Sequence, residues 1–342
     1  MLAASSRKHI ASAGRIGNGP ALRPQKTTER VAEMRFKKLD LNLLVALDAL
    51  LEESSISRAA ERVHLSQGAM SNALARLREH FDDDLLVAVG RRMEATPRAL
   101  ALKPLVRDLL VRIDTTMQVQ PRFDPTTTER SFRVVVSDYS LWVFVPHLLR
   151  HAAGLGSSAR FEFLPQVGEP TQALERGEAD VLIIPKRFVS PEHPATVLFE
   201  DDFTCLMAAD HPLAGQPLTR EAYEAAGHVI MQPTANTSSV GTAIDALHLK
   251  QAGIQRRVEV TSYSFSSLPG MLPGSQRLAT VQRRIARQAC RHLPLVIAEP
   301  AFELPKVDQR LQWHRHRSED PGLLWLRETL LAAARKMDAV SA

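Results

Sequence analysis

The sequence is poor in cysteine and has no long apolar run. Cys205 and Cys290 lie far apart, so a disulfide framework is excluded and a reducing compartment is expected. No stretch approaches the roughly 18 consecutive apolar residues of a membrane-spanning helix. We therefore expect a soluble, cytoplasmic protein without a membrane partner.

The signatures of common catalytic sites are missing as well. The chain has no GxSxG nucleophile elbow, HExxH zinc helix or GxxxxGK[ST] phosphate loop. His314 and His316 have a spacing that suits a metal, but no third ligand is near them in the sequence, so we expect exposed residues at a strand edge. We predict no enzyme, no catalytic residues, no cofactor and no metal site.

The composition supports folded domains and an anionic partner. The 342 residues, 44% of them hydrophobic, give room for two or three domains of about 100–200 residues. The formal charge is +5, which favours an anionic partner. Residues 1–33 are basic and lack the apolar core of a secretory signal. Three interpretations are open: a disordered basic extension, a targeting peptide, or a segment added by translation from a start upstream of Met34, the natural first residue. We favour the disordered extension.

A helix-turn-helix pattern follows. An amphipathic helix is expected from Leu39 to Glu52, and Ser55 or Ser57 can cap the short helix SRAAERV. His64 and Leu65 form the turn. Ser66 occupies the N-cap position of a second helix that ends near Phe81.

This second helix has two unlike faces. One face carries a stripe typical of core packing: Met70, Ala73, Leu74, Leu77 and Phe81. The other face carries short, uncharged side chains: Gln67, Gly68, Ser71, Asn72 and Ala75. Because an ordinary solvent-facing surface is rich in Glu and Lys, the second face predicts contact with another molecule.

A wing and a long helix come next. Two short extended runs around Gly90-Arg91-Arg92 predict a β-hairpin. A helix from about Pro97 to Met117 carries an apolar seam of Leu102, Leu105, Leu109, Ile113 and Met117. The seam predicts pairing with a second copy of the chain, and packing onto its own domain is the alternative.

After the Pro/Thr-rich boundary 121–130, the sequence pattern changes from helices to strands that alternate with helices. The runs SFRVVVS, ARFEFLP and ADVLIIP alternate with helical segments such as SLWVFVPHLLRHAAG, a rhythm that predicts a parallel sheet. A second unit starts near Leu198. The tail, with LPLVIAE, LQWHRH and the terminal helix, is expected to return to the first unit. Two such α/β lobes leave a cleft where small ligands bind.

The stretch LNLLVALDALLEESSISRAAERVHLSQGAMSNALARLREHFDDDLLVAVGRRMEATP resembles the DNA-binding end of LysR-type transcriptional regulators. The opening MRFKKLDLNLLVALDALL, with SFRVVVSDY, RGEADVLIIP and DPGLLWLRETLL, resembles their nodulation-regulator branch. That branch includes activators that answer to plant flavonoids and regulators of chlorinated-aromatic degradation. The family's recognition helix usually starts Ser-Gln-Pro-Ala, so Gly68 departs from it, and we expect lower local stability or a closer approach of the backbone to DNA.

The resemblance implies an α/β protein with an all-α winged helix-turn-helix, a linker helix and a two-lobed, periplasmic-binding-protein-like effector domain. The expected parts are a 1–33 extension, a 34–97 DNA-binding domain, a 98–120 dimerising helix, lobe I at 130–197 and 291–342, and lobe II at 198–290. It also implies homodimers or homotetramers on DNA and an inducer that acts through RNA polymerase. A constitutive repressor, or more remotely a solute-binding or enzymatic protein, is the alternative.

An α-helix fits the major groove of DNA, where short polar side chains reach base edges and arginines reach phosphates. The expected DNA contacts are Ser66, Gln67, Ala69, Ser71, Asn72, Arg76, Arg78, Arg91 and Arg92. Because a dimer presents two such helices, the operator is expected to be an interrupted inverted repeat in a promoter.

The ligand cleft is expected where strands end and helices begin. The expected inducer contacts are Ser137, Tyr139, Ser140, Gln166, Thr234, Tyr263, Ser264 and Phe265. Aromatic rings with nearby hydroxyls favour a flat phenolic inducer. Trp142 is expected to be a packing residue.

Overall fold

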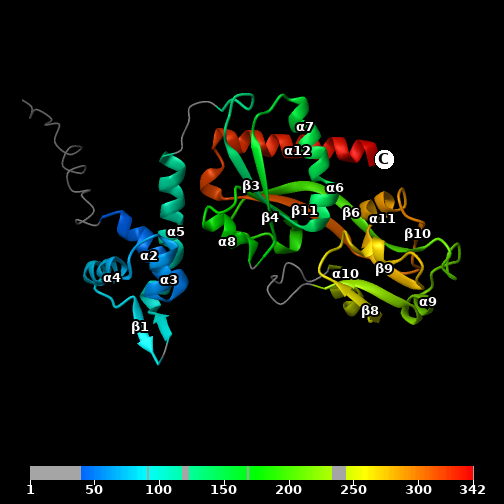
Figure 1. The fold of residues 1–342 in the computed structure, drawn as a ribbon, viewed down its shortest axis with the longest axis horizontal. Coiled ribbons are helices and arrows are strands. Elements are labelled where there is room, and N and C mark those ends of the chain that lie inside the picture. The colour runs from blue at the N-terminus through cyan, green and yellow to red at the C-terminus, as the bar shows by residue number, and fades with distance from the viewer. Residues whose placement is uncertain (1–39, 91, 118–122, 168, 233–243, 342) are drawn as a thin grey trace, which may run out of the picture. The chain divides into compact units, whose positions relative to one another are not determined.

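In the computed structural model the chain forms two compact units (Figure 1). The units are Met1–Ala99 and Leu100–Ala342. The structure describes residues 40–90, 92–117, 123–167, 169–232 and 244–341. The predicted extension 1–33 lies outside these residues. None of the described helices is both long and apolar enough to cross a membrane.

The first unit contains the predicted three helices and hairpin. Its elements are α2 (Asn42–Glu53), α3 (Ile56–Arg62), α4 (Gln67–Phe81), β1 (Leu86–Val89) and β2 (Arg92–Ala95). The hydroxyl of Ser55 accepts the N–H of Arg58, and the hydroxyl of Ser66 accepts the N–H of Ala69 at 3.2 Å. Both are N-caps that satisfy helix donors otherwise left without a partner. The serines therefore fix where α3 and α4 begin, as the sequence predicts.

The apolar stripes of α2 and α4 form the core of this unit. Its fully buried side chains include Leu47, Leu50, Met70, Leu77 and Leu86. The predicted long helix is α5 (Pro97–Met117), and Pro104 lies inside it.

The second unit is built on one mixed sheet of nine strands. The strand order is β4-β3-β5-β11-β6-β9-β7-β8, and β10 pairs with β6. The strands are β3 (Ser131–Val136), β4 (Arg160–Pro165), β5 (Val181–Pro185), β6 (Ala195–Ala208), β7 (Gly227–Met231), β8 (Arg257–Ser262), β9 (Arg277–Gln282), β10 (Leu295–Ala298) and β11 (Lys306–Trp313).

The sheet contains two parallel sets joined by antiparallel strands. In lobe I, β3 pairs in parallel with β4 and β5, as predicted, and in lobe II β7 pairs in parallel with β8 and β9. Strand β6 is long enough to serve both lobes, because its first part pairs with β11 and its second part with β9 and β10. The run LPLVIAE, expected in lobe I, therefore lies against the lobe II half of β6, and the return to lobe I begins with β11.

Helices cover this sheet on its faces (Figure 1). They are α6 (Asp138–Val143), α7 (Val145–Gly154), α8 (Pro170–Glu175), α9 (Arg220–Ala225), α10 (Ile244–Gln251), α11 (Arg283–Ala289) and α12 (Pro321–Ser341). The single helix expected from SLWVFVPHLLRHAAG is split at Phe144 into α6 and α7. Pro146 has no N–H to donate to the carbonyl four residues earlier, and this missing hydrogen bond favours a break in the helix at this point.

A buried ion network joins the start of β3 to the start of α12. The guanidinium of Arg130 donates to both carboxylate oxygens of Asp320, at 2.7 and 2.9 Å. Arg317 lies 2.7 Å from Asp180, whose other oxygen accepts the N–H of Arg133. Burial alone raises the pKa of Asp320, but the Arg130 hydrogen bonds reverse this and leave it lowered. The charges are partnered within the network, as burial requires.

Two buried histidines predict acid sensitivity. Burial lowers the pKa of His228 and of His314 to about 4, against an unfolded value of 6.5. The unfolded chain therefore binds protons first as the pH falls. The preference of the folded state for neutral histidines therefore stabilises it fully above pH 6.5. This contribution to the free energy of unfolding declines between pH 6.5 and 4 and is absent below pH 4.

We expect each of these histidines to remove up to about 3 kcal/mol from the free energy of unfolding between pH 6.5 and 4. Denaturant unfolding at several pH values measures this loss. His228→Gln keeps a donor for the Tyr223 carbonyl that His228 contacts at 2.7 Å, and it should flatten the pH dependence. The exposed His292→Gln is the control. An unchanged slope in His228→Gln would contradict the assignment.

Candidate nucleic-acid interface and ligand cleft

The outward face of α4 is exposed, while the opposite face is buried. Met70, Ala73, Leu74 and Leu77 are buried, as predicted, and Phe81 is half-buried. The exposed residues are Gln67, Gly68, Ala69, Ser71, Asn72, Ala75 and Arg76. The structure thus brings the predicted base-reading side chains onto one exposed helix face.

The hairpin carries the predicted wing arginine. Strands β1 and β2 pair in antiparallel register, with Val89 opposite Arg92. Gly90 at the tip has a φ of +61°, a conformation that favours glycine. The Arg92 side chain is exposed. Arg91 lies outside the described residues.

Arg78 has a different environment from Arg76. Its Nε donates to the carbonyl of Asp84 at 2.8 Å, and its Nη2 donates to the carbonyl of Leu86 at 2.7 Å. These carbonyls flank the start of β1. The guanidinium of Arg78 therefore binds the base of the wing, which helical spacing alone does not predict.

The base of the wing also contains an unusual backbone conformation. Leu85 is fully buried and has a φ of +59°, which costs on the order of 1–3 kcal/mol for a residue of this kind. Asp83 accepts the N–H of Leu85 at 2.7 Å and the hydroxyl of Thr96 at 2.6 Å. These two hydrogen bonds, that of Thr96 first, lower the pKa of Asp83. Side-chain hydrogen bonds thus hold Leu85 in its strained conformation.

The predicted cleft residues of lobe I surround the start of α6. The Ser137 hydroxyl caps the helix by accepting the N–H of Ser140 at 3.2 Å. Tyr139 is buried and donates its hydroxyl to Asp201 at 2.7 Å. Trp142 is 50% exposed. The expectation that Trp142 packs is therefore wrong, and Tyr139 is the ring that packs, because α6 points it toward Phe199.

A hydrogen-bonded bridge crosses from lobe I to lobe II at this point. One carboxylate oxygen of Asp138 accepts the Ser264 hydroxyl at 2.8 Å and the Ser266 N–H at 2.9 Å. Asp138 begins α6, whereas both serines follow β8. Because the bridge joins residues 126 and 128 positions apart in the chain, no local pattern in the sequence predicts it.

The other predicted cleft residues differ in exposure. Tyr263 is 76% exposed, and Phe265 is buried against Phe203 with ring centroids 6.3 Å apart. Gln166 donates from Nε2 to the carbonyl of Ile183 at 2.8 Å. Thr234 lies outside the described residues.

Asp201 connects the cleft helix to the middle of β6. Besides the Tyr139 hydroxyl it accepts the N–H of Arg284, at the start of α11, at 3.2 Å. Arg284 also donates to Asp338 of α12 at 2.6 Å. Burial first, and then the Asp201 charge, raise the pKa of Tyr139. One cluster thus ties α6, β6, α11 and α12 together.

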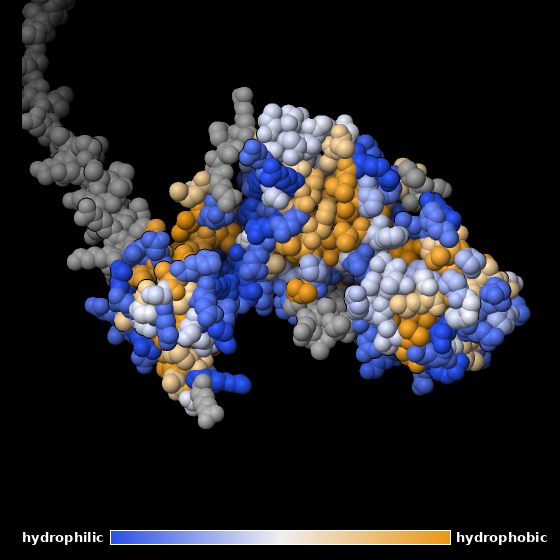
Figure 2. Space-filling model, in the orientation of Figure 1, coloured by the Kyte–Doolittle hydropathy of each residue, from blue (hydrophilic) through white to orange (hydrophobic). Residues whose placement is uncertain are grey.

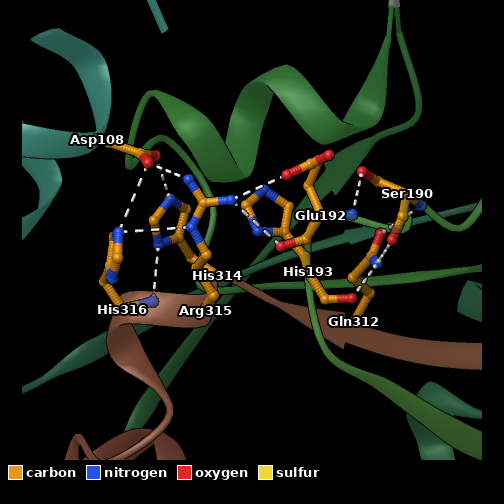
Figure 3. Close-up of polar contacts among 8 residues, drawn as sticks. All are labelled: Asp108, Ser190, Glu192, His193, Gln312, His314, Arg315 and His316. Atoms are coloured by element: carbon orange, nitrogen blue, oxygen red, sulfur yellow. Dashed lines mark hydrogen bonds and ion pairs between the residues drawn. The ribbon is translucent and has the colours of Figure 1, made fainter. Parts of the chain in front are cut away.

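A second polar cluster contains the two histidines of WHRHR (Figure 3). His314 is fully buried, so its expected place at an exposed strand edge is wrong. Its Nδ1 accepts the N–H of His316 at 3.2 Å, and its Nε2 lies 3.7 Å from Asp108 of α5. The neutral ring therefore carries its proton on Nε2.

Arg315 holds this cluster together. Its guanidinium donates to Asp108 and, at 3.1 Å, to Glu192 (Figure 3). His193 packs on His314 with ring centroids 4.7 Å apart. No group of three or more His, Cys, Asp or Glu side chains among the described residues has a geometry that could hold a metal ion. The cluster instead joins α5 to lobe I.

Apolar side chains are also exposed on lobe I. Figure 2 shows apolar surface where α6 and α7 lie in Figure 1. The large exposed apolar residues of these helices are Leu141, Trp142 and Leu149.

Both units match known protein families. Residues 41–100 match the family described as bacterial regulatory helix-turn-helix protein, lysR family, and residues 126–335 match the LysR substrate binding domain. Nodulation protein D of Bradyrhizobium sp. (strain ANU 289) is 39% identical over 308 residues, covering 89% of each chain. Nodulation protein D 2 of Rhizobium tropici is 40% identical over 304 residues, covering 89% of this chain and 96% of the relative.

Solved structures agree with this relationship. A probable transcriptional regulator from Pseudomonas aeruginosa aligns with a TM-score of 0.56 at 26% identity, covering 86% of this chain and 97% of the other. A full-length OxyR variant from Pseudomonas aeruginosa aligns with a TM-score of 0.60 at 18% identity, covering 87% and 95%, which supports the fold alone. The chain therefore belongs to the LysR family of transcriptional regulators, with a DNA-binding domain and a two-lobed effector-binding domain.

Proposed function

We propose that the protein is a transcriptional activator that binds an interrupted inverted repeat as a homodimer or homotetramer and responds to a small phenolic inducer. The proposal includes an effect on RNA polymerase and a cytoplasmic location. The exposed face of α4 carries the DNA part, since its polar side chains protrude from the helix without competing core contacts. The inducer part is supported by the polar bridge between the lobes at Asp138.

The proposed contacts divide by chemistry. Gln67, Ser71 and Asn72 read base edges, and Ala69 meets a thymine methyl. Ser66 contributes its position at the helix start, because its hydroxyl is already the N-cap. Arg76, with Arg91 and Arg92 of the wing, contacts phosphates or the minor groove.

The inducer is proposed to be a neutral or weakly acidic phenol. An ionised carboxylate accepts hydrogen bonds and repels anions, so Asp138 favours a ligand that brings hydroxyl donors. The ligand is expected to contact Ser137, Gln166, Thr234, Tyr263 and Ser264, with Tyr139, Ser140 and Phe265 shaping the wall behind them. A cleft found to be lined by Arg and Lys would contradict this ligand class.

The direct test is a gel shift of the purified protein on the intergenic DNA beside its own gene. It is run across a salt series, with and without a panel of flavonoids and chlorinated phenols. A specific shift whose footprint changes with one compound supports an inducible regulator and identifies the ligand class. Specific binding that ignores every compound and blocks transcription supports the alternative, a constitutive repressor.

Ser71→Ala and Asn72→Ala should each relax preference at one or two base pairs of each half-site, by about 1–3 kcal/mol. Binding selections from a randomised operator measure this change. Arg76→Ala is the matched control, because losing a phosphate contact should weaken all sequences alike and reduce the slope of log K against log salt by about 1. An unchanged preference profile in both alanine variants would remove α4 from base reading.

The apolar seam of α5 should mediate dimerisation. Leu105 and Leu109 are 64% and 41% exposed in the single chain, so a partner helix has apolar area to bury. Leu105→Asp should weaken the dimer more than about 100-fold, because two copies lose this burial. Sedimentation velocity against concentration measures the effect, with the exposed Arg112→Gln as the control. Equal dimer stability in both variants would favour packing of the seam within one chain.

Asp138→Ala should abolish stabilisation by the inducer without unfolding the protein. Thermal unfolding with each compound of the panel compares it with wild type and with the exposed control Glu162→Ala. The expected inducer raises the unfolding temperature of wild type and of the control only. A compound that footprinting identifies as the inducer, and that stabilises all three proteins equally, binds elsewhere.

A further inference from the structure

The wing needs a fixed direction if its arginine is to meet DNA together with α4. We infer that Arg78 is a positioning residue that locks the wing onto the end of the recognition helix, and that it acts on DNA through the wing and not by neutralising a phosphate. The inference rests on the proposed contact between the wing and DNA. The wing joint is defined here as Arg78, Asp83, Thr96 and the carbonyls of Asp84 and Leu86.

The first support is the use of the guanidinium. Arg78 lies in the last turn of α4, and its two donors reach carbonyls six and eight residues further along the chain. Distances of 2.8 and 2.7 Å are those of charge-assisted hydrogen bonds. Because one rigid planar group holds both carbonyls, it fixes the direction of β1 as well as its position.

The second support is an independent set of hydrogen bonds at the same place. Asp83 accepts from the Thr96 hydroxyl at 2.6 Å, which ties the end of β2 to the start of β1. The Thr96 hydroxyl also accepts the N–H of Ala99 in the first turn of α5, at 3.1 Å. The wing joint thus connects the recognition helix, both strands of the wing and the start of the linker helix.

The third support is the strained Leu85 between these groups. A leucine with a φ of +59° persists where its surroundings determine the conformation. Its N–H donates to Asp83, and its carbonyl accepts the N–H of Thr96 at 3.0 Å. Without the joint we expect the loop to relax and the wing to lose its direction.

Hydrogen exchange of the full-length protein without DNA tests the structural step. Arg78→Lys keeps the charge but replaces the planar fork by a single ammonium. We expect faster exchange at the amides of β1 and β2, while α2 and the core side of α4 keep their protection. Unchanged wing protection would overturn the inference, and faster exchange throughout the unit would show general destabilisation instead.

DNA binding by the same variants tests the functional step. Arg78→Lys should weaken operator binding about tenfold, because the lost hydrogen bonds of a charged donor are worth at least that. Hydroxyl-radical footprints should lose protection at the outer flank of each half-site and keep it over the α4 contacts. If Arg78 touches a phosphate, lysine replaces it well, since lysine is itself a competent phosphate ligand.

Asp83→Ala gives a test of sign. Removing a negative charge near DNA strengthens binding if only electrostatics act. The wing joint predicts the opposite, weaker binding with the same flank loss as Arg78→Lys. The positioning role would be overturned if Asp83→Ala bound the operator more strongly than wild type. It would also be overturned if Arg78→Lys bound the operator as well as wild type.

A double-mutant cycle with Arg92→Ala separates this inference from the proposed function. If Arg78 acts through the wing, Arg78→Lys costs less than about threefold in the Arg92→Ala background, whereas independent contacts add within about twofold. Arg76→Ala is the control, and its loss should be the same in both backgrounds. Arg92→Ala alone could leave the affinity for DNA unchanged while Arg78→Lys still speeds hydrogen exchange in the wing. That result would reject the proposed contact between the wing and DNA and would support the role of Arg78 in holding the wing.

Discussion

The backbone ladder of β6 is the interaction on which the effector domain depends. One strand, Ala195–Ala208, pairs with β11 in lobe I and with β9 and β10 in lobe II. A continuous strand cannot bend sharply without losing ladder hydrogen bonds, so β6 couples the two lobes at the point where its partners change. Asp201 lies just before that point, bonded to Tyr139 and to the start of α11. The same cluster that positions α6 therefore lies where β6 passes from one lobe to the other.

Two neighbouring side chains at the start of α6 make hydrogen bonds in different directions. Asp138 faces lobe II and binds its serines, whereas Tyr139, the next residue, faces the sheet and binds Asp201. The contacts of Asp138 with the serines of lobe II thus lie one residue away from the Asp201 cluster. The contact of Asp108 with Arg315 gives lobe I a polar connection to α5 as well. The bridge at Asp138, the Asp201 cluster and the contact between Arg315 and Asp108 all lie within the second unit.

Patterns that extend over a few residues of the sequence predicted the helices, the hairpin and the strands that depend on interactions between neighbours in the chain. The apolar stripe and N-cap of α4, the hairpin, α5 and the parallel strands of lobe I follow from periodicity and capping, which act over a few residues. The division of Arg76 and Arg78 between surface and wing does not, because the carbonyls that bind Arg78 depend on how the loop folds. The burial of His314 and the bridge from Asp138 to Ser264 join residues far apart in the chain. Such contacts depend on the tertiary arrangement, which one sequence without aligned relatives does not encode in any short spacing.

Gly68, in the first turn of α4, is a position where the surface of the helix can change without a change in the core. A Cβ placed at Gly68 has no heavy atom of the protein within 4 Å, and the residue lies in the exposed first turn of α4. A side chain gained there would meet no steric resistance inside the fold and would extend toward whatever the helix faces. Single substitutions at position 68 can thus change the exposed surface of α4 while they leave the core untouched. Under the proposed function, such a substitution would alter which DNA sequences the regulator prefers while the scaffold stays the same.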